Sequence, residues 1–132
     1  MKLNNKGFTL IEILAAVAIM SILSGVAVMA VTRYIEKTQR EAYEIMQKTV
    51  YDAAASYHQN NPNVINIDID ISTLKTEGYL ESLQDPSNKN EDCSGTVTIS
   101  KTGGSATVLD SYTYTVNLQC EKYHESDKTF TS

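Results

Sequence analysis

Hydrophobic and polar positions divide the chain into stretches of different pattern. Residues 8–31 are almost continuously apolar, and Glu12 is the only charged residue among them. A helix that rises 1.5 Å per residue would extend this run over about 36 Å, compared with about 30 Å for the hydrocarbon core of a bilayer. We therefore expect a helix that can cross a membrane, preceded by a short polar segment over residues 1–7.

The next stretch, residues 32–61, has the pattern of an amphipathic helix. Its apolar side chains recur at spacings of three, four and seven, which favours one buried helical face. The residues predicted for this face are Ile35, Ala42, Ile45, Met46, Val50, Ala53, Ala54 and Tyr57. Pro62 ends the pattern, because proline cannot donate a helical hydrogen bond. We expect one continuous helix from about Phe8 to about Gln59.

Residues 62–132 have the pattern of a small sheet. Isoleucines alternate with polar residues over residues 63–71, which predicts an extended strand or a strand-like loop with one buried face. Residues 96–101 and 112–118 alternate and are rich in β-formers. A further short strand is possible over residues 106–109. Ser72 or Thr73 is expected to cap a short helix that ends near Gly78. Residues 121–132 lack periodicity and are expected to form an exposed end.

These patterns together predict an α+β fold, in which a long N-terminal helix packs against a small antiparallel sheet. The expected parts are a short polar segment (1–7), a helix that can cross a membrane (8–31), its amphipathic continuation (32–61) and a C-terminal globular region (62–132).

The chain has two cysteines, Cys93 and Cys120, both in the predicted globular region. If the two longer strands pair as antiparallel neighbours with Thr96 opposite Leu118, both cysteines lie at the same end of the sheet, within reach of a disulfide. An even cysteine pair in an exported domain favours this bridge. Two unpaired buried thiols are the alternative.

Charge and residue usage argue against several classes of function. The net charge is −5 and the pI about 4.9, whereas a nucleic-acid-binding protein needs a basic surface. His58 and His124 have no cysteine or carboxylate cluster at metal-ligand spacing, and both are expected at the surface. The serines lack a Gly-x-Ser-x-Gly setting. We expect no enzyme activity, no metal, no cofactor and no nucleic-acid partner.

Glu12 is the unusual residue of the apolar run. A carboxylate one helical turn into such a run is unfavourable unless it has a partner. Cleavage after Gly7 would supply one, the new α-amino group of Phe8. Lys2 and Lys6 before the run place the N-terminus in the cytoplasm by the positive-inside rule.

The sequence Lys6-Gly7-Phe8-Thr9-Leu10-Ile11-Glu12, followed by a long apolar helix, resembles the prepilin motif of type IV pilins and type II secretion pseudopilins. The resemblance implies that a prepilin peptidase cleaves after Gly7 and methylates the amino group of Phe8. It also implies that Glu12 pairs with the mature N-terminus of a neighbouring subunit during assembly. A disulfide that closes a surface loop is common in the family and would here join Cys93 to Cys120.

The resemblance implies a structural subunit of a pilus-like filament, built from copies of this chain and other pilins for surface attachment, motility or a related task. Its partners would be the prepilin peptidase, a membrane platform protein and a cytoplasmic assembly ATPase. The chain would be a single-pass membrane protein before assembly and an extracellular filament afterwards. Alternatives are a minor or competence-type pilin, a type II secretion pseudopilin, and a membrane-anchored extracellular binding domain that does not assemble.

Overall fold

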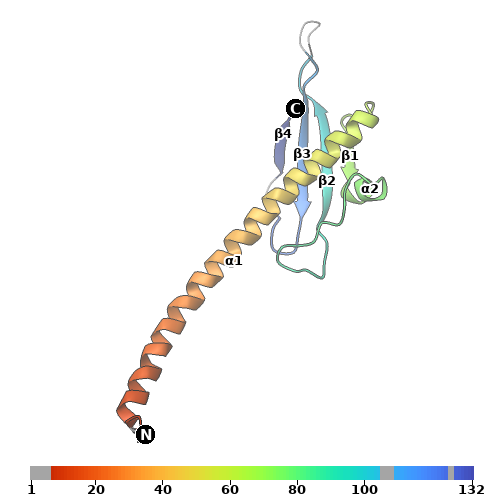
Figure 1. The fold of residues 1–132 in the computed structure, drawn as a ribbon. Coiled ribbons are helices and arrows are strands. Elements are labelled where there is room, and N and C mark those ends of the chain that lie inside the picture. The colour runs from red at the N-terminus through yellow and green to blue at the C-terminus, as the bar shows by residue number, and fades with distance from the viewer. Residues whose placement is uncertain (1–6, 105–108, 125–126) are drawn as a thin grey trace, which may run out of the picture. The chain divides into compact units, whose positions relative to one another are not determined.

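The structure is a computed structural model, and it describes residues 7–104, 109–124 and 127–132. The described elements follow the chain as helix, strand, short helix and three strands, which is an α+β arrangement (Figure 1). The chain divides between Thr38 and Gln39 into two compact units, and helix α1, Leu10–Asn60, contributes residues to both.

In the first unit, helix α1 carries the apolar run. The long apolar side chains of this run are exposed, from 84% at Phe8 to 51% at Ile13. The hydroxyl groups of Ser21 and Ser24 each donate to the carbonyl four residues earlier, at 2.8 and 2.7 Å, as their positions predict. These two hydroxyl groups are thus satisfied within the helix, while its apolar surface requires surroundings other than water.

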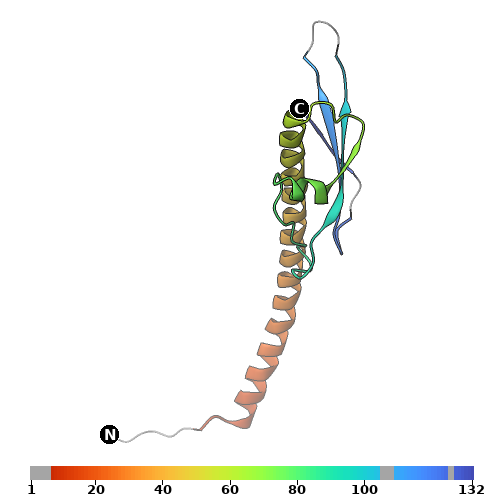
Figure 2. The same cartoon turned by 90° about the vertical axis from the view of Figure 1, so that its right-hand side faces the viewer.

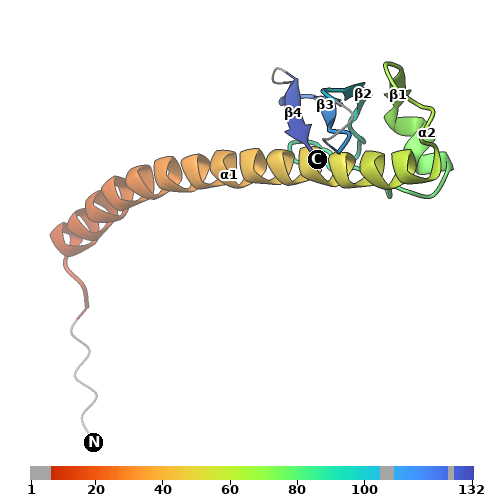
Figure 3. The ribbon, with the colours of Figure 1, turned by 90° about the horizontal axis from the view of Figure 1, so that it is seen from above.

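The described residues of the second unit form a four-stranded sheet. The strands are β1 (Asp68–Asp70), β2 (Ser94–Lys101), β3 (Tyr112–Gln119) and β4 (Lys128–Thr131). They lie in the order β1-β2-β3-β4, and every neighbouring pair is antiparallel. The C-terminal part of α1 lies along one face of this sheet (Figure 3). The core of the second unit lies between these two layers.

The pairing of β2 with β3 is confirmed, but the predicted register is wrong by one residue. Thr96 lies opposite Asn117, and Leu118 lies opposite Gly95. A Cβ atom on Gly95 would lie 2.0 Å from the carbonyl oxygen of Asn117, so glycine is required there for the strands to approach. The observed register puts the alternate residues of β3 from Tyr114 to Leu118 in the core.

The buried face of α1 differs from the predicted one in several residues. Tyr43, Gln47, Val50, Ala53, Ala54 and His58 are buried. Ile45 is 67% exposed and Ile35 48% exposed, so both predictions are wrong. The actual face follows the spacing 43, 47, 50, 54, and it includes polar or amphipathic residues that an apolar pattern passes over. The Tyr43 hydroxyl, for instance, donates to the carbonyl oxygen of Leu118 at 2.7 Å.

His58 was expected at the surface, and it is buried instead, at 6% exposure. Its ring packs against Tyr112, with the ring centroids 4.6 Å apart in an edge-to-face arrangement. His124 is exposed, as expected. The aromatic side chains that surround His58 come from β3, which is why the helix sequence alone gave no sign of its burial.

The segment between α1 and β2 is only partly as predicted. Within residues 63–71, a strand forms only over Asp68–Asp70, and Ile67 is 55% exposed. Helix α1 ends at Asn60, two residues before Pro62. Helix α2, Ile71–Thr76, is capped by Asp70 rather than by Ser72 or Thr73, because the Asp70 carboxylate accepts from the Ser72 N–H at 2.8 Å. This hydrogen bond holds the pKa of Asp70 below its usual value.

The C-terminal segment is not the exposed end that was expected. Residues 128–131 form β4, and Tyr123 is buried at 6% exposure. Phe130 stacks on Tyr51 of α1 with the ring centroids 4.7 Å apart. A strand of four residues with a single aromatic side chain is too short for periodicity to detect. The possible strand over residues 106–109 lies mostly outside the described residues.

Candidate processing and assembly site

The peptide bond between Gly7 and Phe8 lies just before the helix. Residues 7–9 are irregular, and Figure 2 shows this segment leading into the first turn of α1. Gly7 and Phe8 are both exposed, and apart from its chain neighbours no described residue lies within 4 Å of the position of a Cβ on Gly7. A bond that is exposed and outside regular structure can be reached by a protease.

Thr9 and Glu12 form a reciprocal cap at the helix start. The Thr9 N–H donates to Oε2 of Glu12 at 3.2 Å, and the Glu12 N–H donates to Oγ1 of Thr9 at 3.4 Å. With Thr9 as N-cap and Glu12 as the third helical residue, these contacts are a capping box. The positive end of the helix dipole also favours a carboxylate at this place.

The cap places the Glu12 carboxylate next to the backbone at which processing would occur. Its Oε2 atom already accepts from the N–H of Thr9, and an α-amino group on Phe8 would be the next nitrogen along the chain. Glu12 is therefore held at the end of the helix rather than extended along its side. The Glu12 carboxylate can therefore act as a negatively charged hydrogen-bond acceptor for an N–H group or an ammonium group.

The side chains around Glu12 are apolar. A groove with a volume of about 480 Å³ lies along the start of the helix. It is lined by Phe8, Glu12, Ile13, Ala16, Val17 and Met20. Glu12 is its only charged member. A second apolar helix laid along this surface would place the carboxylate in surroundings of low dielectric constant, where an ionic partner matters most.

Comparison with known families bears on this segment. Residues 2–28 match the family model described as the prokaryotic N-terminal methylation motif, the prepilin signature of type IV pilins. The chain carries a prepilin signature. The match covers the leader, the cap residues and most of the apolar run. A search of curated proteins and a search of solved structures gave no match.

The prepilin signature and the long apolar helix fit a single-pass membrane protein of the type IV pilin or pseudopilin kind. By length and composition, α1 can cross a membrane, and its most apolar part is not buried. The family with this signature is a family of structural, pilin-type proteins and not of enzymes. Cleavage after Gly7, methylation of Phe8 and the role of Glu12 in assembly remain predictions.

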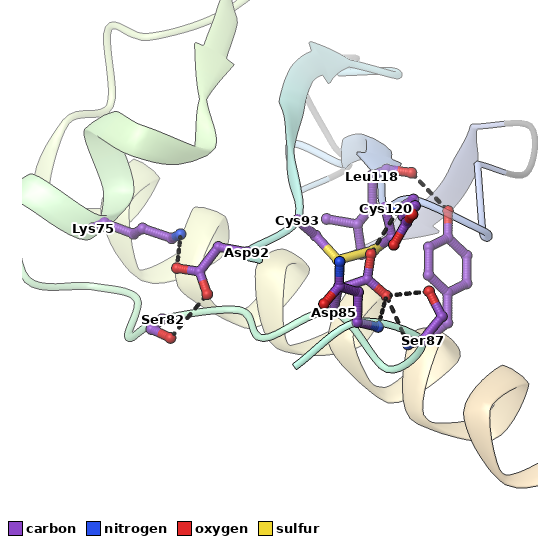
Figure 4. Close-up of a disulfide and its surroundings, with 11 residues drawn as sticks. Lys75, Ser82, Asp85, Ser87, Asp92, Cys93, Leu118 and Cys120 are labelled. Atoms are coloured by element: carbon purple, nitrogen blue, oxygen red, sulfur yellow. Dashed lines mark hydrogen bonds and ion pairs between the residues drawn. A yellow bond between two sulfur atoms is a disulfide. The ribbon is translucent and has the colours of Figure 1, made fainter. Parts of the chain in front are cut away.

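The two cysteines are joined, as the sequence predicts. Cys93 and Cys120 form a disulfide across a separation of 27 residues, with their Cα atoms 4.5 Å apart (Figure 4). Both cysteines are buried. Among the described residues, Asp85, Cys93 and Cys120 form a cluster of potential metal ligands, but the disulfide removes the thiolates that a metal would bind.

Asp85 lies beside the disulfide and is 2% exposed (Figure 4). Its Oδ1 atom accepts from the N–H and the hydroxyl of Ser87, at 2.7 and 2.6 Å, and from the N–H of Asn88 at 3.3 Å. Its Oδ2 atom accepts from the N–H of Glu121 at 2.6 Å. The carboxylate thus connects the loop before β2 to the residue that follows Cys120.

These contacts set the charge state of Asp85. Burial raises the pKa of its carboxyl, but the hydrogen bonds from Ser87, Glu121 and Asn88 together outweigh burial and lower the pKa below its usual 3.8. Asp85 is therefore ionised at neutral pH and is satisfied by hydrogen-bond donors rather than by a cation.

Thr9 and Asp85 were not predicted as functional residues from the sequence. Thr9 could have been found, because Thr-x-x-Glu before an apolar run is the sequence pattern of a capping box. Asp85 stands in no sequence motif of this kind. Its long-range bond to Glu121 depends on the β2–β3 pairing and leaves no local pattern.

Removal of the disulfide should lower the stability of the full chain in detergent. A cross-link across 27 residues restricts the unfolded chain and contributes about 3 to 4 kcal/mol. We expect the double variant Cys93→Ser, Cys120→Ser to have a free energy of unfolding in urea that is lower by this amount. Reductant should lower the free energy of unfolding of the natural chain by a similar amount. The double variant should not respond to reductant. Equal stability of the natural and double-variant chains would contradict the prediction.

Acid should weaken the contribution of Asp85. Because its pKa is lowered by folding, the stabilisation is fully present above about pH 4, the usual range of a free carboxyl, and disappears as the pH falls through the lower folded pKa. Asp85→Asn should reduce the unfolding free energy by about 2 to 3 kcal/mol at pH 7, and by progressively less below pH 4. Asp52→Asn, at an exposed helical position, is the control and should show neither effect.

Proposed function

We propose that the chain is a structural subunit of a type IV pilus-like filament, assembled through its N-terminal helix. The observation that carries this proposal is the joint presence of the prepilin signature, an exposed apolar helix and a single carboxylate held at the start of that helix. None of the three alone separates a filament subunit from an ordinary membrane anchor.

The membrane is the first location of the proposed subunit. Residues 8–31 are long enough to cross the hydrocarbon core, and Lys2 and Lys6 hold the leader on the cytoplasmic side. A prepilin peptidase then cleaves the exposed bond between Gly7 and Phe8 and methylates Phe8. The second unit, which contains a disulfide, lies on the oxidising side of the membrane.

Cleavage changes the donors that surround Glu12. Before cleavage, the carboxylate accepts from the Thr9 N–H within its own helix. After cleavage, a charged amino group exists at Phe8 of every mature copy. In the filament, Glu12 of one copy pairs with the Phe8 amino group of a neighbour, and this pair sets the axial register of the two helices.

Assembly replaces lipid around the apolar run with other helices. Both surroundings are apolar, so the exchange itself provides little driving force, and packing together with the buried ion pair must supply specificity. Extraction of the helix from the membrane then requires an input of energy. We assign this role to a cytoplasmic ATPase that acts through a platform protein in the membrane. A minor pilin, a competence-type pilin or a pseudopilin would use the same steps at lower abundance or for secretion.

Mass spectrometry of the mature chain tests processing. We expect the chain isolated from a host with a prepilin peptidase to begin at Phe8 and to carry one additional methyl group on its amino terminus. Without the peptidase, the leader should remain. A mature chain that keeps residues 1–7, or begins beyond Val31, would contradict the proposal.

Substitution of Glu12 tests assembly and separates its charge from its role as a cap. Glu12→Gln keeps the capping-box geometry, since glutamine serves at this position, but removes the charge. We expect Glu12→Gln and Glu12→Ala to reduce filament yield by at least tenfold in electron microscopy of sheared cells, with membrane insertion unchanged. Glu36→Ala, outside the apolar run, is the control. Normal filaments from Glu12→Gln would refute the role of the charge.

A further inference from the structure

β1 and β4 are the edge strands of the sheet, and each has one side on which the described sheet has no further strand. Figures 1 and 3 show them on opposite sides of the sheet. An edge strand presents N–H and C=O groups that can pair with a strand of another chain. The two edges are therefore the places where this sheet can be extended.

The register identifies the groups at the β4 edge. The Ser132 N–H donates to the Tyr112 carbonyl at 3.0 Å, so these two residues form a hydrogen-bonded pair. In an antiparallel ladder such pairs alternate with pairs whose N–H and C=O groups point away. Phe130 therefore bonds to β3, whereas the backbone groups of Thr129 and Thr131 point to the open side of β4.

The same reasoning applies to β1. The Asn66 N–H donates to the Ile99 carbonyl at 2.7 Å, so the odd-numbered residues of β2 direct their backbone groups toward β1. Ile69 is paired with one of these odd-numbered residues and bonds to β2. The N–H groups of Asp68 and Asp70, with the carbonyl of Asp68, consequently point to the open side of β1.

We propose that β1 of one copy of this chain adds to β4 of a neighbouring copy, so that the four-stranded sheets join edge to edge along the filament surface. This inference rests on the proposed function, because copies in a filament share one orientation. Neighbouring strands alternate in direction, and the described part of the sheet has four of them. β1 of an identically oriented neighbour therefore runs antiparallel to β4 without any inversion.

The side chains at the two edges match in this arrangement. Asp68 of one copy lies opposite Thr131 of the other, and Asp70 opposite Thr129. All four side chains are exposed in the single chain. A threonine hydroxyl can donate to the facing carboxylate, as the hydroxyl of Thr98 already does to Asp68 within the chain. Cross-strand pairs of this kind stabilise a sheet.

Pairing of like edges is disfavoured. Two β1 strands in antiparallel contact would set Asp68 of each copy against Asp70 of the other, and like charges directly opposite each other repel. Two β4 strands could pair antiparallel only if one copy were inverted. Identically oriented copies meet only through unlike edges, and such head-to-tail contacts produce open helical assemblies.

Apolar surface accompanies both edges. Beside β4 lies a groove of about 420 Å³, lined by Glu41, Glu44, Ile45, Lys48, Lys128 and Phe130. Ile45 in this groove is 67% exposed, and Ile67, which directly precedes β1, is 55% exposed. Each margin therefore offers apolar area as well as backbone groups, and a neighbour seated at either margin would remove some of this area from water.

Cysteine cross-linking of filaments tests the contact. Residues in a hydrogen-bonded antiparallel pair have Cα atoms about 5.5 Å apart, which suits a disulfide. We expect filaments of Asp68→Cys with Thr131→Cys to give a ladder of covalent multimers after mild oxidation. The matched control is Asp68→Cys with Thr113→Cys, because Thr113 lies on the same face one strand further in. The control filaments should give no ladder.

Filaments of the test variant that give no ladder, or a ladder equal to that of the control, would overturn the edge-to-edge contact. If the doubly substituted chain does not assemble, chains with Asp68→Cys alone and Thr131→Cys alone can be co-expressed. A cross-linked dimer of the two is then expected, and its absence overturns the contact. Failure of the natural chain to form filaments would contradict the proposed function instead.

A proline at Thr129 gives a second, independent test. The Thr129 N–H points away from β3, so Thr129→Pro removes a donor from the open edge and leaves the β3–β4 hydrogen bonds in place. We expect the disulfide and membrane insertion to be kept and the filament yield to fall at least tenfold. Filament yield equal to that of the natural chain would overturn the proposal.

Discussion

The apolar surface of residues 8–31 is the constraint on which the rest of this molecule depends. These side chains are exposed in the single chain, and they are stable only where lipid or other apolar helices surround them. The second unit, in contrast, buries its apolar side chains in a core of its own. Glu12 interrupts the apolar surface at one point, where the capping box satisfies it.

The second unit is small, and its core is formed where α1 packs against a sheet of short strands. The face of α1 that includes Tyr43, Val50 and Ala54 packs into the core, and tyrosine supplies both apolar area and a hydrogen bond to β3. A sheet of four short strands buries little area, so the disulfide and the bonds of Asp85 contribute a large share of the stability of this unit.

The sequence predicted those parts of the fold whose signal is local and repeated. The long helix, its end before Pro62, the antiparallel pairing of residues 96–101 with residues 112–118 and the disulfide are confirmed. Burial of His58 and the strand β4 were not predicted, because both depend on aromatic contacts between segments far apart in the chain. The exposed Ile45 shows that an apolar residue on a helix does not by itself indicate the core.

The same distinction applies to the candidate site. Gly7, Phe8 and Glu12 stand in a short contiguous motif, so sequence alone identifies them. The carboxylate of Asp85 bonds to residue 121, 36 positions away, and only the folded sheet brings the two together.

Asp85 and the disulfide close the same loop by two unrelated kinds of bond. The sulfur bridge is sensitive to reductant and indifferent to proton concentration, whereas the carboxylate contacts respond to protons and not to reductant. Either condition alone leaves one closure intact. The loop before β2 would therefore separate from the residues that follow β3 only in surroundings that are acidic and reducing together.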